Sequence, residues 1–249
     1  MNLWQQCQGE QHLQTLQGTL FRLVESQEQV ATLGYVDNLA EQALLEQMLE
    51  DVKPPSPLDA SGLHYLLRTP FRYPPLPWGS RFGSVHEPSL FYGALDTPTA
   101  LAETAYYRLL FWHSMVAPAP KTQLRTQHTL FSVGYRSGRA VALHQPPFAA
   151  HEALLRHRSH YHACQQLGAA MRASAVELFE YRSARAPAGG LCVALFSPSP
   201  FLQKRPRNSA RWFCEVTAEQ VTFKALQADQ LIHFAARDFL VDGELPHPA

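Results

Sequence analysis

A short apolar run that passes directly into a helix start indicates that this chain combines strand and helix. Residues 89–95 are rich in Leu, Phe and Tyr and follow the breaker pair Glu87-Pro88, a pattern that predicts a buried strand. Asp96-Thr97-Pro98 then supplies an N-cap side chain and a proline at the first helical position. Apolar residues at helical spacing continue from Ala100 to Trp112, so we expect a strand followed at once by a helix.

Three polar residues in this segment are spaced eleven positions apart. Arg81 precedes the predicted strand, Tyr92 lies inside it, and Glu103 falls in the second turn of the helix. We expect a cleft above the strand to collect the three side chains. Each residue alone has a simpler interpretation, since an arginine can form a surface salt bridge, a strand tyrosine can pack in the core, and a helical glutamate can be solvated.

Two separated motifs give these residues a family resemblance. The arginine, the aromatic-Tyr-Gly-Ala strand and Thr-Ala-Leu-x-Glu resemble the RES domain, a bacterial toxin fold related to ADP-ribosyltransferases that acts on NAD. The stretch EYRSARAPAGG, residues 180–190, resembles the Tyr-x-Ser-x-Arg segment of that family, and the strand LCVALF follows it. The resemblance covers roughly residues 63–201 and maps the name-giving residues to Arg81, Glu103 and Ser183. One departure is Phe82-Gly83, where several relatives carry Trp-Asn.

The resemblance implies an α/β (α+β) fold with an ADP-ribosyltransferase-like split, mostly antiparallel sheet and flanking helices. Residues 1–52 are predicted to form a preceding helical region, because apolar residues recur at three- and four-residue steps in 13–24 and again in 36–48. A break between these two helices is expected at Gly34-Tyr35. Residues 53–62 form a proline-rich linker, and residues 63–249 form the catalytic domain, with a loose tail from Gly243.

Further elements follow from local patterns. Residues 64–68 are predicted to be a strand that carries Arg68, and residues 151–175 to be one helix. Alternating runs on either side of Ser137-Gly138 predict a hairpin. The remaining predicted strands are residues 129–135, 139–143, 191–196, 211–216 and 221–226.

The chemistry of NAD cleavage assigns a role to each candidate residue. When the bond between nicotinamide and ribose breaks, the sugar acquires oxocarbenium character, which an ionised carboxylate such as Glu103 stabilises. Forked guanidinium donors suit the two phosphates, and Arg81, helped by Arg68 or Arg185, supplies them. Tyr92 would orient the nicotinamide or ribose by stacking. The hydroxyl of Ser183 suits a ribose hydroxyl or the incoming acceptor.

These roles divide the candidates into two overlapping sets. We predict the catalytic residues to be Arg81, Tyr92, Glu103 and Ser183, and the NAD-binding residues to be Arg68, Arg81, Tyr92, Ser183 and Arg185. NAD serves as substrate, inorganic phosphate is a candidate co-substrate, and no metal is expected. Water as acceptor gives an NAD glycohydrolase, phosphate an NAD phosphorylase, and a protein side chain an ADP-ribosyltransferase.

Two other classes of protein stay open. The chain can be a non-catalytic module that recognises a nucleotide or a partner through the same cleft. A zinc enzyme is the other alternative, because His160 and Cys164 are four residues apart in the predicted helix, but no second pair at a recognisable spacing completes a site. G-x-S-x-G, P-loop and G-x-G-x-x-G motifs are absent, which argues against serine hydrolases, P-loop NTPases and Rossmann dehydrogenases.

Composition and resemblance together indicate the partners and the compartment. The 21 basic and 21 acidic residues balance, so we expect no direct nucleic-acid binding. There is no apolar run of membrane-spanning length and no export signal, and the four cysteines are scattered, which favours reduced thiols in the cytoplasm. By resemblance, the protein partner is a cognate antitoxin with an Xre-like helix-turn-helix part; homo-oligomers are a further expectation.

Overall fold

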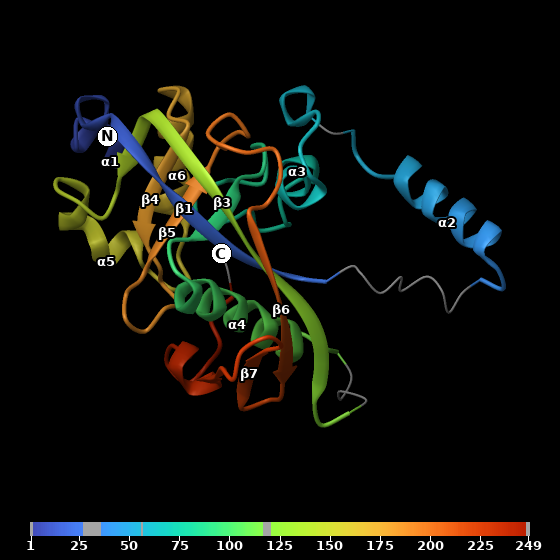
Figure 1. Cartoon of the computed structure of the whole chain (residues 1–249). Coiled ribbons are helices and arrows are strands. Elements are labelled where there is room, and N and C mark those ends of the chain that lie inside the picture. The colour runs from blue at the N-terminus through green and yellow to red at the C-terminus, as the bar shows by residue number, and fades with distance from the viewer. Residues whose placement is uncertain (1, 27–35, 56, 117–120, 248–249) are drawn as a thin grey trace.

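The computed structural model describes residues 2–26, 36–55, 57–116 and 121–247. Eight strands make up one sheet, and α-helices and short 3₁₀ turns flank it (Figure 1). The strands are β1 (Gln14–Glu25), β2 (Phe91–Ala94), β3 (Leu124–Ala142), β4 (Leu178–Arg182), β5 (Leu191–Leu195), β6 (Asn208–Val216), β7 (Gln220–Ala225) and β8 (Leu231–Ala235). The helices are α1 (Leu3–Gln6), α2 (Leu39–Asp51), α3 (Tyr65–Arg72), α4 (Thr97–His113), α5 (Glu152–Leu155) and α6 (His162–Ala173), with 3₁₀ turns at Gly9–His12, Leu58–Ala60, Phe148–His151 and Ala236–Phe239.

The sheet is antiparallel except where β3 and β4 run parallel. The strand order is β1-β2-β5-β4-β3-β6-β7-β8, and β1 also pairs with β3. Five strands therefore close into a ring, from which β6, β7 and β8 extend as an arm. This arrangement confirms the mixed α/β fold with a mostly antiparallel sheet that the sequence predicts.

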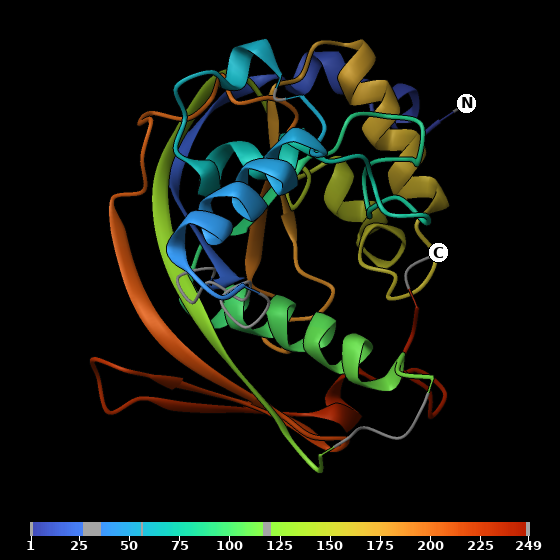
Figure 2. The ribbon, with the colours of Figure 1, turned by 90° about the vertical axis from the view of Figure 1, so that its right-hand side faces the viewer.

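The split in the sheet arises at β3. One edge of this strand pairs with β1 along most of its length, while the other edge pairs with β6 through residues 124–132 and with β4 through residues 140–142. Between these two stretches, β3 meets the loop at residues 200–203 instead of a strand. The sheet thus divides into the ring and the arm. Helix α4 packs between them, against β1 and β2 of the ring and against β6 and β7 of the arm (Figure 2).

Helix α4 begins as the sequence predicts. The Asp96 side chain accepts a hydrogen bond from the backbone N–H of Thr99 at 2.7 Å, and Pro98 occupies the second helical position rather than the first. Ala100, Leu101, Ala105, Tyr106 and Leu109 are all buried against the sheet. The buried face fixes the helix across the split, and this fixes the direction in which Glu103 points.

The helical prediction for residues 13–24 is wrong, because this segment is strand β1. Leu20 packs inside the ring of strands, whereas Leu23 joins the larger core under α4. Leu20 and Leu23 are buried on opposite faces of the strand, so its apolar residues do not alternate and their spacing resembles that of a helix. The helix predicted in 36–48 is confirmed as α2, and Gly34-Tyr35 lies outside the described residues.

Four other local predictions are also corrected. Residues 64–68 lie in or at the start of helix α3, whose first turn the His64 side chain caps by accepting from the N–H of Leu66. The expected hairpin at Ser137-Gly138 is part of the continuous strand β3, since β1 pairs with it on both sides of that position. The helix predicted over residues 151–175 is interrupted between α5 and α6, and the tail is held where the Tyr106 hydroxyl donates to the carbonyl oxygen of Pro246.

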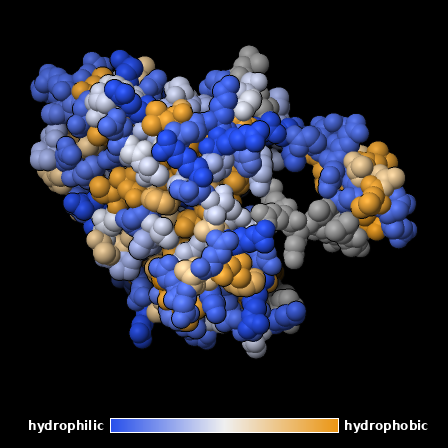
Figure 3. All heavy atoms as spheres, viewed as in Figure 1, coloured by the Kyte–Doolittle hydropathy of each residue, from blue (hydrophilic) through white to orange (hydrophobic). Residues whose placement is uncertain are grey.

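Helix α2 lies apart from the body that carries the sheet (Figure 1). Its C-terminal end is tied to α3, where Arg72 pairs with Glu50 and donates to the carbonyl oxygen of Pro54. Leu44 and Met48 are exposed, and Figure 3 shows apolar side chains gathered on this helix. Strand β1 belongs to the sheet although it precedes α2, and the domain limits placed at residues 53–62 stay a prediction. None of the helices in the described residues has the length and apolarity needed to cross a membrane.

A buried histidine in β3 makes the fold sensitive to acid. His128 shares a hydrogen bond with the hydroxyl of Thr126 at 2.9 Å, and burial, aided by the positive charge of Arg108, lowers the pKa of His128 to about 4. Between pH 6.5 and 4 the His128 imidazole is protonated in the unfolded chain but stays neutral in the folded protein. We therefore expect this residue's contribution to the free energy of unfolding, full above pH 6.5, to decrease by up to about 3 kcal/mol as the pH falls to 4.

The variant His128→Phe provides the comparison, because it removes the titrating group and keeps a ring next to Phe223. Chemical denaturation at pH 7.5 and pH 4.5 should show a smaller loss of stability for the variant than for the natural protein. Equal losses in the two proteins would contradict the prediction.

Candidate active site

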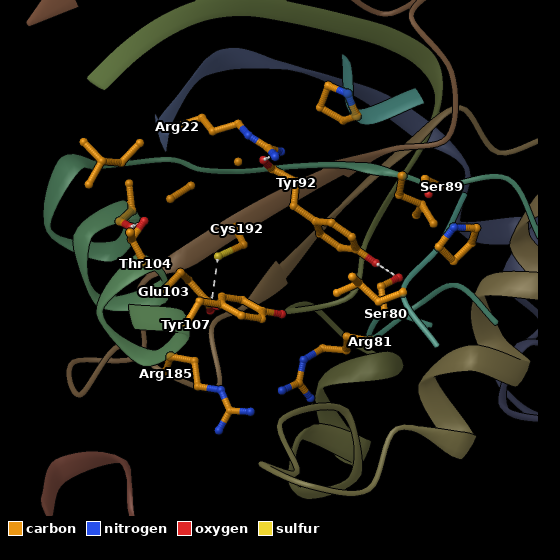
Figure 4. A pocket seen from close by; sticks show the side chains of 18 of the residues that line it. Arg22, Ser80, Arg81, Ser89, Tyr92, Glu103, Thr104, Tyr107, Arg185 and Cys192 are labelled. Carbon is orange, nitrogen blue, oxygen red and sulfur yellow. Dashed lines mark hydrogen bonds between the residues drawn. The ribbon is translucent and has the colours of Figure 1, made fainter. Parts of the chain in front are cut away.

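A cavity of about 440 Å³ opens between β1, β2, α4 and the loop that follows α3 (Figure 4). Strand β2 runs along its wall and α4 presents Glu103 from its second turn. The polar side chains of the lining are those of Arg22, Thr69, Tyr73, Ser80, Arg81, Ser89, Tyr92, Glu103, Thr104, Tyr107, Tyr161, Tyr181 and Arg185. The structure thus brings Arg81, Tyr92, Glu103 and Arg185 to one cavity, as the sequence pattern predicts.

Ser183 lies behind Glu103 and orients its carboxylate. The serine is fully buried, and its Oγ accepts from the backbone N–H of Arg185 at 3.0 Å and of Ala186 at 2.8 Å. A hydroxyl has one proton and two lone pairs, so these contacts leave the proton for Glu103 Oε1, 2.5 Å away. Oε2 of Glu103 has no hydrogen-bond partner among the described residues. Ser183 therefore holds one carboxylate oxygen and leaves the other available to a ligand.

Tyr92 crosses the cavity and is fixed at both ends. Its hydroxyl hydrogen-bonds with Ser80 Oγ at 2.8 Å and accepts from the N–H of Phe82 at 3.2 Å, while its carbonyl oxygen accepts from Arg22 at 2.8 Å (Figure 4). Burial raises the pKa of the phenol to about 12, so it stays neutral near pH 7. Phe82 itself is buried, edge-on to Phe179 and Tyr181. Phe82, which stands where several relatives carry Trp, is thus a core residue beside the site.

Tyr161 contacts two arginines of the cavity wall, Arg81 and Arg185. Arg81 lies over its ring at 4.4 Å and donates to the carbonyl oxygen of His157 at 2.8 Å. Arg185 donates to the Tyr161 hydroxyl at 2.9 Å and lies 3.5 Å over the ring of Tyr106. Arg185 is only 3% exposed, and its Nη1 has no hydrogen-bond partner in the described structure. Arg185 thus places a positive charge next to the cavity, which favours an anionic ligand there.

Arg22 is the main residue that the sequence interpretation missed, and Arg68 and Ser183 are the predicted residues that do not line the cavity. Arg68 lies on α3 and does not line the cavity. Arg22 lies on β1, stacks over Phe91 at 4.8 Å and lines the cavity; burial lowers its pKa to about 10, which leaves it charged near pH 7. It is the one cation inside an otherwise apolar run, a signal that the helical assignment of this segment concealed.

His160 and Cys164, the pair behind the zinc alternative, are not part of a metal site in the described residues. His160 packs against His157, with ring centroids 4.4 Å apart, and Cys164 is buried with its thiol directed to the carbonyl oxygen of Leu155. Groups of three or more His, Cys, Asp or Glu side chains suited to a metal ion are not found in these ranges of the chain. The four cysteines are all free and buried.

The split, mostly antiparallel sheet with flanking helices is the ADP-ribosyltransferase-like fold that the sequence predicts. The sequence model of the RES domain matches residues 56–217, and the chain belongs to the RES family. Members of this family are toxin-like modules related to NAD and are typically half of a toxin–antitoxin pair. No curated protein matches the chain significantly. Strand β1 and Arg22 lie outside the matched range although they complete the sheet and the cavity.

Proposed function

We propose that the protein cleaves NAD at the bond between nicotinamide and ribose and acts as a toxin by depleting cytoplasmic NAD. The observation that supports this most strongly is the carboxylate of Glu103, which Ser183 holds through one oxygen at the wall of a cavity that arginines also line. An oriented carboxylate stabilises the positive charge that develops on the ribose, because it is in place before the reaction begins.

The proposed reaction breaks one bond and forms one bond, and three acceptors are possible. The bond from ribose C1″ to the pyridinium nitrogen breaks, and its electron pair leaves with nicotinamide, which becomes neutral. An oxygen of the acceptor then bonds to C1″ and, where it carries a proton, releases it to solvent or to Glu103. Water gives ADP-ribose, inorganic phosphate gives ADP-ribose-1″-phosphate, and a protein side chain gives a modified protein.

The arginines would bind the diphosphate of NAD. Arg81 and Arg185 both line the cavity and both contact Tyr161, so their positive charges would attract the diphosphate to one part of the cavity. Tyr92, neutral and held at both ends, would act as a rigid surface beside the nicotinamide or ribose. We further propose that an antitoxin with a helix-turn-helix part covers this cavity and so silences the toxin, in keeping with the paired arrangement typical of the family.

Incubation of the purified protein with NAD tests the proposal. We expect loss of NAD with release of free nicotinamide, resolved by chromatography in parallel reactions with and without phosphate. ADP-ribose-1″-phosphate that forms only with phosphate would identify a phosphorylase, and ADP-ribose in both reactions a glycohydrolase. Intact NAD after incubation with the free protein and with cell extract would overturn the proposal in favour of a non-catalytic binding module.

A further inference from the structure

The cavity has an apolar end that the proposed bond cleavage does not use. We call it the proline shelf and define it as Pro70, Tyr73, Pro74, Pro75 and Leu76, which line the cavity from α3 and the loop after it. Tyr73 is 40% exposed and Leu76 is 52% exposed. Apolar side chains that face open space on a cavity wall are typical of a surface that a ligand covers.

The proline shelf is rigid without a ligand. Its prolines fix their own backbone angles, and the hydroxyl of Ser89 donates to the carbonyl oxygen of Tyr73 at 2.9 Å. At the other end, the N–H of Gly79 donates to the carbonyl oxygen of Leu76 at 2.7 Å, in a turn that needs glycine because its φ is +74°. A preformed surface binds a ligand without the cost of ordering a loop.

The proline shelf and Glu103 lie at opposite ends of Tyr92. Figure 4 shows Glu103 and Thr104 on one side of the Tyr92 ring, with Ser80 and Ser89 beyond its hydroxyl. Because Ser89 is bonded to Tyr73, the shelf lies beyond that hydroxyl too. Arg81 also lines the cavity, and Figure 4 shows its side chain running from beside Ser80 toward Arg185, so a cation lies between the two ends. The order along the cavity is therefore carboxylate, cation and apolar shelf.

From this order we infer that the proline shelf binds the adenosine half of NAD and makes the enzyme specific for dinucleotides over nicotinamide mononucleotide. The inference rests on the proposed function, which places the nicotinamide riboside at Glu103. A diphosphate then extends past the arginines, and adenine, a flat base with apolar faces, reaches Tyr73 and the prolines. The shelf contributes binding energy far from the bond that breaks, so its loss raises KM more than it lowers kcat.

The loop provides a matched pair of variants. Tyr73 and Trp78 are both 40% exposed, but only Tyr73 lines the cavity. We expect the natural protein to cleave NAD with kcat/KM at least about 100-fold above that for nicotinamide mononucleotide, which carries the same scissile bond and lacks adenosine. Tyr73→Ser should lower kcat/KM for NAD about 10-fold through KM and leave the mononucleotide unchanged, whereas Trp78→Ser should change neither.

Three results would overturn the inference: equal use of both substrates by the natural protein, an equal loss for both in Tyr73→Ser, or the same effect from Trp78→Ser. Calorimetric titration with ADP-ribose separates this inference from the proposed function. A roughly 10-fold weaker affinity in Tyr73→Ser but not in Trp78→Ser supports the shelf even if no turnover is found. Unchanged affinity in both variants rejects it, whatever the enzyme does to NAD.

Discussion

Replacing Glu103 with Gln should lower the kcat for NAD cleavage roughly 10³-fold while changing NAD affinity only a few-fold. The amide keeps the size of the side chain and still offers an oxygen to the Ser183 hydroxyl, so the local structure should persist. What it loses is the negative charge that would stabilise the ribosyl cation. Nicotinamide release and equilibrium binding of NAD, measured on the same preparations, separate the loss of chemistry from a loss of binding.

The control for this variant is Glu219→Gln, which removes one exposed carboxylate from the turn between β6 and β7. Its turnover should equal that of the natural protein. Turnover by Glu103→Gln within about threefold of the natural rate would rule out the charge of this carboxylate as the source of catalysis.

The second large effect concerns stability, and we expect it from Gly168→Ala. Gly168 lies in α6 where the helix packs directly on the backbone of Phe82, and an added Cβ would overlap the carbonyl oxygen of that residue. Because a backbone atom cannot rotate away, the loop or the helix has to move, at a cost of about 1–3 kcal/mol in the free energy of unfolding. Arg81 precedes Phe82, so the displaced loop should also reduce NAD cleavage.

Gly138→Ala is the matched substitution, since the nearest atom to its added Cβ would be the Thr15 hydroxyl at 3.9 Å. Urea denaturation should give the two variants midpoints that differ clearly, with Gly138→Ala within about 0.5 kcal/mol of the natural protein. Similar stability for both variants would show that α6 adjusts to the extra methyl group at little cost.

The local signals in the sequence were strongest around the site. Asp96 and Pro98 mark the start of α4, and the spacing of Arg81, Tyr92 and Glu103 places all three at one cavity. Long-range pairing was not predictable in the same way. The apolar residues of β1 are arranged for two different cores, Leu20 for one and Leu23 for the other, and only the partner strand β3 shows that the segment is extended.

The predicted Arg68 and the overlooked Arg22 show the same limit, because neither position in the fold follows from the local sequence. Arg68 was chosen because the family resemblance implies a site arginine on the first strand, but the segment is a helix and Arg68 does not line the cavity. Arg22 was overlooked because its strand is separated from the motif by more than fifty residues. The role of Ser183 also depends on tertiary contacts, because only the two N–H groups that occupy its lone pairs show that it donates to Glu103.

The pairing of β1 with β3 sets an order of events during synthesis of the chain. Residues 14–25 leave the ribosome early, but their partners lie at residues 128–140. A strand whose partner lies more than a hundred residues away closes late in folding. The loop carrying Ser183 and the neighbouring strand β5 come later still. The nascent chain therefore carries Arg22, Arg81 and Glu103 without an assembled cavity until β5 has been made, and any NAD-cleaving activity can begin only after that point.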